Sequence, residues 1–425
     1  MTGLIPNLWI KNKTFLKDAG TSLAGTVLAQ AIAFAAQPIL RRYYTPEMFG
    51  ELSVFLSLTG LFASIATFRY ELALMLPSSD IRCLQMLLGA FILNSIFSFF
   101  LGIIYFFCSG ILSKVLNTSE TFACTIPLSA VAVWAYGNFL LVQNYLSKHR
   151  QYKFLNQIRA LRRGSEVSAQ WILSFLSSYG LVLGELMGRL IMSLTGLGFI
   201  FRKLKDNRLK TRETIKLLLV FKKFPTYSLF PTFLNSLALL APGLLVNFHF
   251  GTYQNGIFDM SLQILVIPIG LTITTLGNVI LSEISSRYRK KEPIFPFLRL
   301  NFFILLGFAL VITGVLWIVG PTGFKLLFGN PYEKAWSYAL LLLPGLTSRL
   351  VTAPLAVFFA GVNQIQKSVW WQYLYALIVI GLFFYPFDDV EKFIITYSLA
   401  EFLLNSLYLW QIFRTCKTMT LEFVH

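Results

Sequence analysis

Charged residues are scarce in this sequence, and so are the residues that build most catalytic and metal sites. Only 13% of the residues are charged, whereas a typical soluble domain carries about 25%. The chain has three histidines and four cysteines, and the cysteines form no CxxC pair. Zinc centres and histidine-based catalytic triads are therefore disfavoured, and we expect the cysteines to be packing residues. No loop is long enough to hold a soluble catalytic domain.

Apolar sequence is abundant instead. Hydrophobic residues make up 56% of the chain, and uncharged runs recur that reach the roughly 20 residues a helix needs to cross a bilayer. We predict an all-α, polytopic membrane protein with about twelve spans. The predicted spans are 19–40, 50–74, 83–107, 120–143, 160–177, 181–201, 225–248, 256–281, 299–320, 336–361, 368–387 and 393–413. Spans five and six require a turn near residues 177–180.

The positions of lysine and arginine predict the orientation, because basic loops stay on the cytoplasmic side. With both termini in the cytoplasm, the inner segments hold most of the 36 basic residues, including dense groups over 148–163, 202–223 and 287–299. The net charge of +17 is then explained by inner loops that attract anionic lipid headgroups. Nucleic-acid binding is not needed to explain it.

The basic segment 203–224 contains apolar residues among its lysines and arginines, which predicts a helix lying in the membrane interface. It also divides the chain into a six-helix bundle over 1–205, a connector over 206–224 and a second six-helix bundle over 225–425, arranged around a central cavity. Sliding the chain over itself aligns Phe15 with Phe221, Ser22 with Ser228, Thr26 with Thr232 and Gly50 with Gly256. Parallel repeats of this kind are a transporter architecture.

Two stretches resemble a known family. Residues 38–50, Pro-Ile-Leu-Arg-Arg-Tyr-Tyr-Thr-Pro-Glu-Met-Phe-Gly, and residues 68–77, Phe-Arg-Tyr-Glu-Leu-Ala-Leu-Met-Leu-Pro, resemble the start of bacterial O-antigen and polysaccharide flippases. These belong to the multidrug/oligosaccharidyl-lipid/polysaccharide exporter superfamily. The resemblance extends more loosely over the remaining chain through the layout of six plus six spans and residues 275–283.

The resemblance implies a V-shaped pair of helical bundles in the bacterial inner membrane. Such a protein moves an undecaprenyl-diphosphate-linked oligosaccharide, an O-antigen or capsule repeat unit of lipopolysaccharide or exopolysaccharide synthesis, to the outer leaflet by alternating access. It is a transporter with no chemical step and no cofactor, and coupling to Na⁺ or H⁺ is left open. A polysaccharide polymerase and a chain-length protein are its implied partners. A drug or metabolite antiporter of the same superfamily is the alternative, and a membrane polysaccharide polymerase or ligase is a third.

Charged residues inside the predicted spans are the candidate site residues, because arginine pairs phosphate oxygens in bidentate fashion and a buried charge needs a partner or water. Arg349 and Glu401 lie near the middle of the tenth and twelfth spans. In one interpretation Arg349 binds the cargo and Glu401 is a coupling carboxylate. In the other, the two side chains form an ion pair between neighbouring helices and neutralise each other. Glu185 and Arg189, four residues apart on the sixth span, are expected to pair locally.

The remaining candidates lie near the ends of spans. Arg69 and Glu71 are near the inner end of the second span, where a role in the cavity competes with snorkelling of the arginine. Arg41 and Arg42 end the first span, either as diphosphate contacts or, as we favour, as helix anchors. Asp259 ranks below Glu401 as a coupling carboxylate because it lies near a span end. No metal site is predicted.

Overall fold

The described part of the chain consists of helices and the turns that join them. The computed structural model describes residues 25, 27–77, 79–205, 211–364 and 366–424, and no strand occurs among them. Two compact units are present, one of Met1–Tyr44 and Val54–Ser236 and the other of Thr45–Ser53 and Leu237–His425. We call them unit 1 and unit 2. The division falls within α2 (Pro46–Ala66) and within α10 (Lys223–Lys290).

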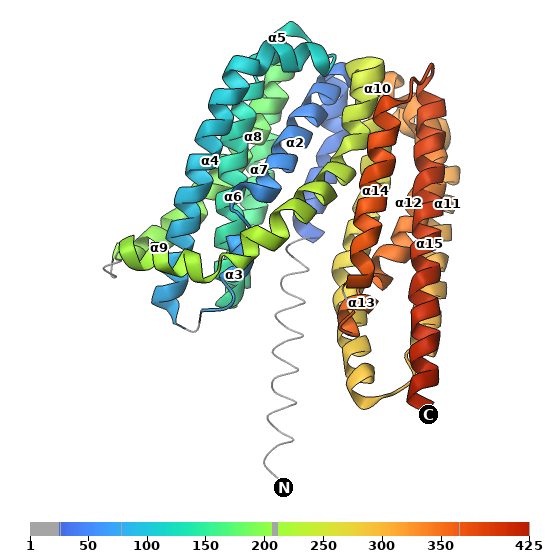
Figure 1. Cartoon of the computed structure of the whole chain (residues 1–425). Coiled ribbons are helices and arrows are strands. Elements are labelled where there is room, and N and C mark those ends of the chain that lie inside the picture. Colours follow the sequence, from blue (N-terminus) through green and yellow to red (C-terminus); the bar gives the residue numbers. More distant parts are fainter. Residues whose placement is uncertain (1–24, 26, 78, 206–210, 365, 425) are drawn as a thin grey trace. The chain divides into compact units, whose positions relative to one another are not determined.

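Unit 1 is a bundle of long helices joined by short turns (Figure 1). Besides its share of α2 and α10 it contains a helix over 27–43, α3 (Tyr70–Ala73), α4 (Asp80–Val115), α5 (Glu120–Ala123), α6 (Ile126–Lys148), α7 (Tyr152–Ile172), the 3-10 turn η1 (Ser174–Leu176), α8 (Ser178–Lys205) and α9 (Thr211–Val220). Serines begin two of these helices: Ser79 and Ser119 accept hydrogen bonds from the backbone of α4 and α5, as N-caps do.

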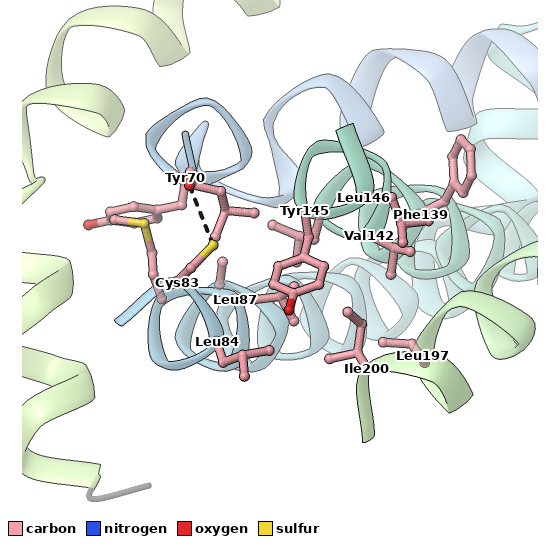
Figure 2. Packing of buried hydrophobic residues seen from close by; sticks show 14 of the residues in the cluster. Tyr70, Cys83, Leu84, Leu87, Phe139, Val142, Tyr145, Leu146, Leu197 and Ile200 are labelled. Atoms are coloured by element: carbon pink, nitrogen blue, oxygen red, sulfur yellow. Dashed lines mark hydrogen bonds between the residues drawn. The ribbon is translucent and has the colours of Figure 1, made fainter. Parts of the chain in front are cut away.

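The core of unit 1 lies where α4, α6 and α8 meet (Figure 2). Its members include Leu84 and Leu87 of α4, Val142, Tyr145 and Leu146 of α6, and Leu197 and Ile200 of α8. Lipid tails are as apolar as these side chains, so helix association in a bilayer depends on close packing and on polar contacts between helices. Asn94 of α4 supplies such contacts, because its amide donates to Trp134 O at 2.9 Å and to Asn138 Oδ1 at 2.8 Å.

Unit 2 contains the remaining helices (Figure 1). They are α11 (Phe295–Phe328), the 3-10 turn η2 (Asn330–Tyr332), α12 (Glu333–Leu355), α13 (Phe358–Gly361), α14 (Gln366–Phe384) and α15 (Val390–Val424). Unit 2 also includes α10 from Leu237 onward. α12 packs on both α11 and α15. The start of α2 crosses α10 at two glycines: a Cβ on Gly50 would lie 1.9 Å from Thr252 O, and one on Gly256 would lie 1.8 Å from Pro46 O. Glycine is required for this backbone contact.

Large apolar side chains cover the outer surface of both units. Phe107 of α4 is 77% exposed and Ile318 of α11 is 87% exposed. Nine helices of the described residues are long and apolar enough to cross a membrane, and one of these, Lys223–Ile273, is 51 residues long and covers parts of two predicted spans. Exposed apolar surface of this extent would be unstable in water. The chain is therefore a multi-pass membrane protein.

The predicted seventh and eighth spans both lie in α10, which consists of two helices that meet at a sharp break at Gly251. This residue has φ 82° and ψ 177°, a conformation open essentially only to glycine. The break falls between the predicted ranges 225–248 and 256–281. A similar glycine break at Gly320 (φ 60°) marks the end of the predicted ninth span within α11.

The predicted second and fifth spans have other boundaries in the structure, and the start of the predicted first span is not tested. The first six residues of the predicted span 19–40 lie outside the described part. The predicted second span, 50–74, is α2 ending at Ala66, a turn, and the short helix α3. The predicted fifth span, 160–177, is α7, which begins eight residues earlier at Tyr152 and is not among the nine helices above because of its charged residues.

Candidate functional site

Arg349 of α12 and Glu401 of α15 form an ion pair in unit 2. Arg349 Nη2 donates to Glu401 Oε1 at 2.8 Å and to the hydroxyl of Tyr375 on α14 at 2.9 Å. The Glu401 side chain is 1% exposed and that of Arg349 is 19% exposed. The sequence left open whether these two residues pair, and the structure places them in direct contact.

Hydroxyl and amide donors complete the surroundings of Glu401. Oε1 accepts from the hydroxyls of Tyr375 and Tyr397, the latter at 3.0 Å, and Oε2 accepts from Asn405 Nδ2 at 3.1 Å. Both carboxylate oxygens are thus hydrogen-bonded. Arg349 is the cation of this cluster, and the two tyrosines and Asn405 supply its neutral donors.

Close packing of α12 on α15 brings the two charges together. A Cβ on Gly345 would lie 2.8 Å from both Glu401 Cβ and Ser398 O, so only glycine allows this approach. The backbone N–H of Gly345 donates to Ser398 Oγ at 3.0 Å. Gly345 follows Pro344, which lies inside the helix and cannot donate a backbone hydrogen bond. α12 therefore lacks one backbone hydrogen bond at Pro344 and gains one to Ser398 of α15 at the next residue.

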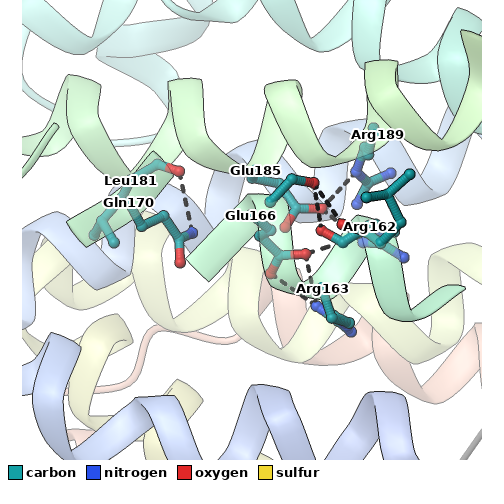
Figure 3. Close-up of polar contacts among 9 residues, drawn as sticks. Arg162, Arg163, Glu166, Gln170, Leu181, Glu185 and Arg189 are labelled. Atoms are coloured by element: carbon teal, nitrogen blue, oxygen red, sulfur yellow. Dashed lines mark hydrogen bonds and ion pairs between the residues drawn. The ribbon is translucent and has the colours of Figure 1, made fainter. Parts of the chain in front are cut away.

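A second charged cluster lies between α7 and α8 in unit 1 (Figure 3). Glu185 Oε1 accepts from Arg189 Nε at 2.5 Å and from Arg162 Nη2 at 2.9 Å. Glu166 accepts twice from Arg163 Nη1, at 2.8 and 3.0 Å, and lies 3.7 Å from Arg162 Nε. Three arginines and two glutamates leave this cluster with one uncompensated positive charge.

Glycines on α8 set the spacing of this second cluster. A Cβ on Gly188 would lie 2.8 Å from Glu166 Cβ and 3.0 Å from Arg162 O, and one on Gly184 would lie 2.7 Å from the backbone nitrogen of Gln170. Small residues at membrane helix interfaces allow backbones to approach closely. Gln170 adds a hydrogen bond from its amide to Leu181 O at 3.3 Å. α7 therefore turns its polar side chains toward α8.

The local pair Glu185 and Arg189 was predicted from their spacing, but three members of the cluster were missed. Arg162 and Arg163 were counted with the basic inner segment before the fifth span, and Glu166 was given no role. The structure adds them to the cluster, because α7 begins at Tyr152, Arg162 bonds to Glu185 of α8, and Arg163 bonds to Glu166 within α7. Their spacing of three and four residues was the available signal, since such residues share one face of a helix.

Arg69 and Glu71 also form a contact, but not within a span as predicted. After α2 ends at Ala66, Phe68 and Arg69 adopt left-handed conformations with φ 52° and 62°. The turn lets Arg69 Nη1 reach Glu71 at 2.9 Å, while Thr67 Oγ1 donates to the other carboxylate oxygen at 2.5 Å. Glu71 is buried and paired, and Arg69 lies in a turn between helices.

Arg41, Arg42 and Asp259 lie outside these clusters. Arg41, at the end of helix 27–43, is buried and donates from Nε to Gln37 Oε1 at 2.9 Å, whereas the neighbouring Arg42 is exposed. Asp259 of α10 is half-buried and accepts from Gln263 Nε2 at 2.7 Å. Within the described residues, no three histidine, cysteine, aspartate or glutamate side chains gather as a metal site would require.

Comparison with protein families gives one match that covers most of the chain. The family model for polysaccharide biosynthesis proteins matches residues 39–337. This range includes α2 and the turn at Arg69, together with the α7–α8 cluster. No curated protein matches the sequence. The family match confirms the resemblance noted at residues 38–50 and 68–77.

Several solved structures share the fold. An inward-facing multidrug resistance MATE family transporter of the MOP superfamily matches with a TM-score of 0.73 and 14% identity, over 92% of this chain and 95% of the other. The lipid II flippase MurJ in an inward closed conformation matches with a TM-score of 0.71 and 12% identity, over 94% and 90%. A MOP superfamily transporter from Pyrococcus furiosus matches with a TM-score of 0.58 and 13% identity, over 95% of each chain. At these identities the likeness concerns the fold.

Proposed function

We propose, because this chain belongs to the family of polysaccharide biosynthesis proteins, that it is a flippase for a lipid-linked saccharide. It is a transporter without a chemical step. The cargo we propose is an undecaprenyl-diphosphate-linked O-antigen or capsule repeat unit, moved from the inner to the outer leaflet of the bacterial inner membrane by alternating access. Both termini are cytoplasmic in this proposal, in agreement with the basic segments of the sequence.

The family match carries the proposal, because the fold does not discriminate between cargoes. A multidrug transporter and a lipid II flippase match the chain about equally well, with TM-scores of 0.73 and 0.71. A drug or metabolite antiporter is therefore the second candidate, supported by the likeness to the multidrug transporter. A family defined by polysaccharide biosynthesis favours a saccharide cargo over a drug.

The charged clusters supply what such a cargo needs. A diphosphate must cross the bilayer next to fixed cations, and arginine keeps its charge and binds phosphate oxygens in pairs. The α7–α8 cluster of Arg162, Arg163 and Arg189 carries an excess positive charge over its two glutamates. We assign these arginines and Arg349 to cargo binding. Arg69, Arg41 and Arg42 are secondary candidates along the path.

Glu401 is the carboxylate that we assign to cation coupling. Its two oxygens already accept hydrogen bonds from Arg349, Tyr375, Tyr397 and Asn405. A sodium ion would have to displace these donors, because hard cations need oxygen ligands with available lone pairs. A proton needs only one oxygen, so we propose H⁺ as the coupling ion at this residue. Glu185, Glu71 and Asp259 are the remaining coupling candidates.

Complementation of a strain that lacks its O-antigen flippase tests the function. Expression of this protein is expected to restore surface polymer, and Arg349→Gln is expected to abolish the restoration at equal protein level. Arg287→Gln is the matched control, because Arg287 pairs with Glu283 at 2.7 Å but is more exposed. Failure in hosts with several different glycans, combined with gained drug resistance, would show that the cargo is a drug.

A further inference from the structure

Basic and apolar side chains share the outer surface of α9, the short helix before α10. Ile215, Leu219 and Val220 are 54, 61 and 70% exposed. The basic residues Arg212, Lys216, Lys222 and Lys223, on α9 and directly after it, are exposed as well. A helix that presents apolar and basic side chains together on an exposed surface is typical of segments that lie at a membrane surface.

The opposite face of α9 packs against α3 and α4 of unit 1. A Cβ on Gly89 of α4 would lie 2.9 Å from both Leu218 Cδ1 and Thr214 Cγ2, so α9 approaches α4 closely at this glycine. The hydroxyl of Tyr70 on α3 donates to Leu218 O at 3.0 Å, and Gln85 Nε2 donates to Glu213 Oε2 at 3.1 Å. α9 is thus fastened to α3 and α4 through one face only.

These contacts place α9 near one end of unit 1. Gln85 and Gly89 lie in the first ten residues of α4, which at 1.5 Å per residue is within about 15 Å of its start at Asp80. α9 runs across α4 instead of alongside it (Figure 1). A helix that crosses a membrane-spanning helix near its end lies where lipid headgroups meet the hydrocarbon.

We propose that the exposed face of α9 binds the headgroups of anionic phospholipids. Its basic residues complement a negative headgroup surface, and each Lys or Arg near such a surface strengthens binding about fivefold. A protein partner fits less well, because a helix of 10 residues provides only a fraction of the roughly 800 Å² per partner of a stable interface. The bound lipids hold α9 on α4 and thereby keep α3 and its neighbouring turn in place. The proposal does not depend on the cargo.

Hydrogen exchange of the full-length protein in vesicles tests the proposal. Backbone amides of residues 211–220 are compared in pure phosphatidylcholine and in equal parts of phosphatidylcholine and phosphatidylglycerol. We expect slower exchange with phosphatidylglycerol. In that lipid, Lys216→Gln is expected to exchange about fivefold faster, and the triple variant Arg212→Gln, Lys216→Gln, Lys222→Gln faster by on the order of a hundredfold.

The matched control neutralises three exposed basic residues of another basic segment, Arg289→Gln, Lys290→Gln, Lys291→Gln. It is expected to leave exchange in α9 unchanged in both lipids. Equal exchange rates of wild-type α9 in the two vesicle types would overturn the proposal. If protection of α9 is absent from both vesicle types but present in native membranes and lost on removal of a host protein, the surface binds a protein and the proposal is wrong.

Discussion

Removing the charge of Arg349 tests the cluster in unit 2 most directly. In Arg349→Met, Glu401 keeps its hydrogen bonds from Tyr375, Tyr397 and Asn405 but loses its only cation within 4 Å among the described residues. Breaking a buried ion pair from one side costs about 3 to 5 kcal/mol, because a charge is left uncompensated. The three remaining donors reduce this loss, so we expect about 3 kcal/mol.

The double variant Arg349→Met, Glu401→Gln removes both charges and keeps an amide oxygen for the hydroxyl donors. Replacing a whole buried ion pair by neutral side chains of similar size is often close to neutral in stability. We therefore expect the double variant to recover most of the lost stability, about 2 of the 3 kcal/mol. Export is expected to stay absent, because the cation is still missing.

Thermal unfolding of the purified protein and surface polymer in the complemented strain are the two assays. Arg287→Met is the control, because its partly exposed pair with Glu283 is expected to contribute at most about 1 kcal/mol. Normal export by the stable double variant would refute a cargo role for Arg349 and leave the pair a structural element. A loss below about 1 kcal/mol in Arg349→Met would refute the ion pair itself.

Three further substitutions test individual contacts by thermal unfolding. Gly184→Ala places a Cβ against Gln170 and is expected to cost about 1 to 3 kcal/mol, whereas Gly198→Ala on the same helix meets open space and should be neutral or slightly stabilising. Gly251→Ala, at φ 82°, is expected to cost about 1 to 3 kcal/mol. The control Gly314→Ala within α11 meets open space and should have little effect. Equal melting temperatures of the two variants would contradict the glycine-only conformation. Tyr397→Phe removes one hydrogen bond from the Glu401 carboxylate and is expected to cost about 1.5 kcal/mol or more, while Tyr373→Phe, at an exposed position, should have no effect.

Local spacing was enough to predict part of each charged cluster. Glu185 and Arg189 are four residues apart on one helix, and their contact follows from helix geometry alone. The same rule applies to Tyr397 and Asn405, which lie four residues before and after Glu401 and donate to it. Their hydrogen bonds could have been read from the sequence, whereas Tyr375 comes from another helix and could not.

The pairing of Arg162, Arg163 and Glu166 was missed because of a physical ambiguity in the sequence. A basic residue beside an apolar run indicates either a cytoplasmic loop or a buried ion pair, and the positive-inside rule assumes the loop. Arg162 bonds to Glu185 of the next helix, so only the tertiary structure reveals its partner. The break at Gly251 was easier to predict, because the sequence loses its apolar character between the two long runs 225–248 and 256–281. This signal is local and does not depend on which helices pack against α10.

The charged face of α7 also has a consequence for the synthesis of the protein. Each unpaired arginine or acidic residue near the middle of a helix adds about 2.5 to 3.5 kcal/mol to the cost of membrane insertion. α7 carries Arg162, Arg163 and Glu166 close together, and Glu185 of α8 pairs with both Arg162 and Arg189. Because the charges of one helix are paired by the other, we expect α7 and α8 to enter the membrane together as a hairpin. Substitutions that break these pairs are then expected to lower the amount of protein in the membrane.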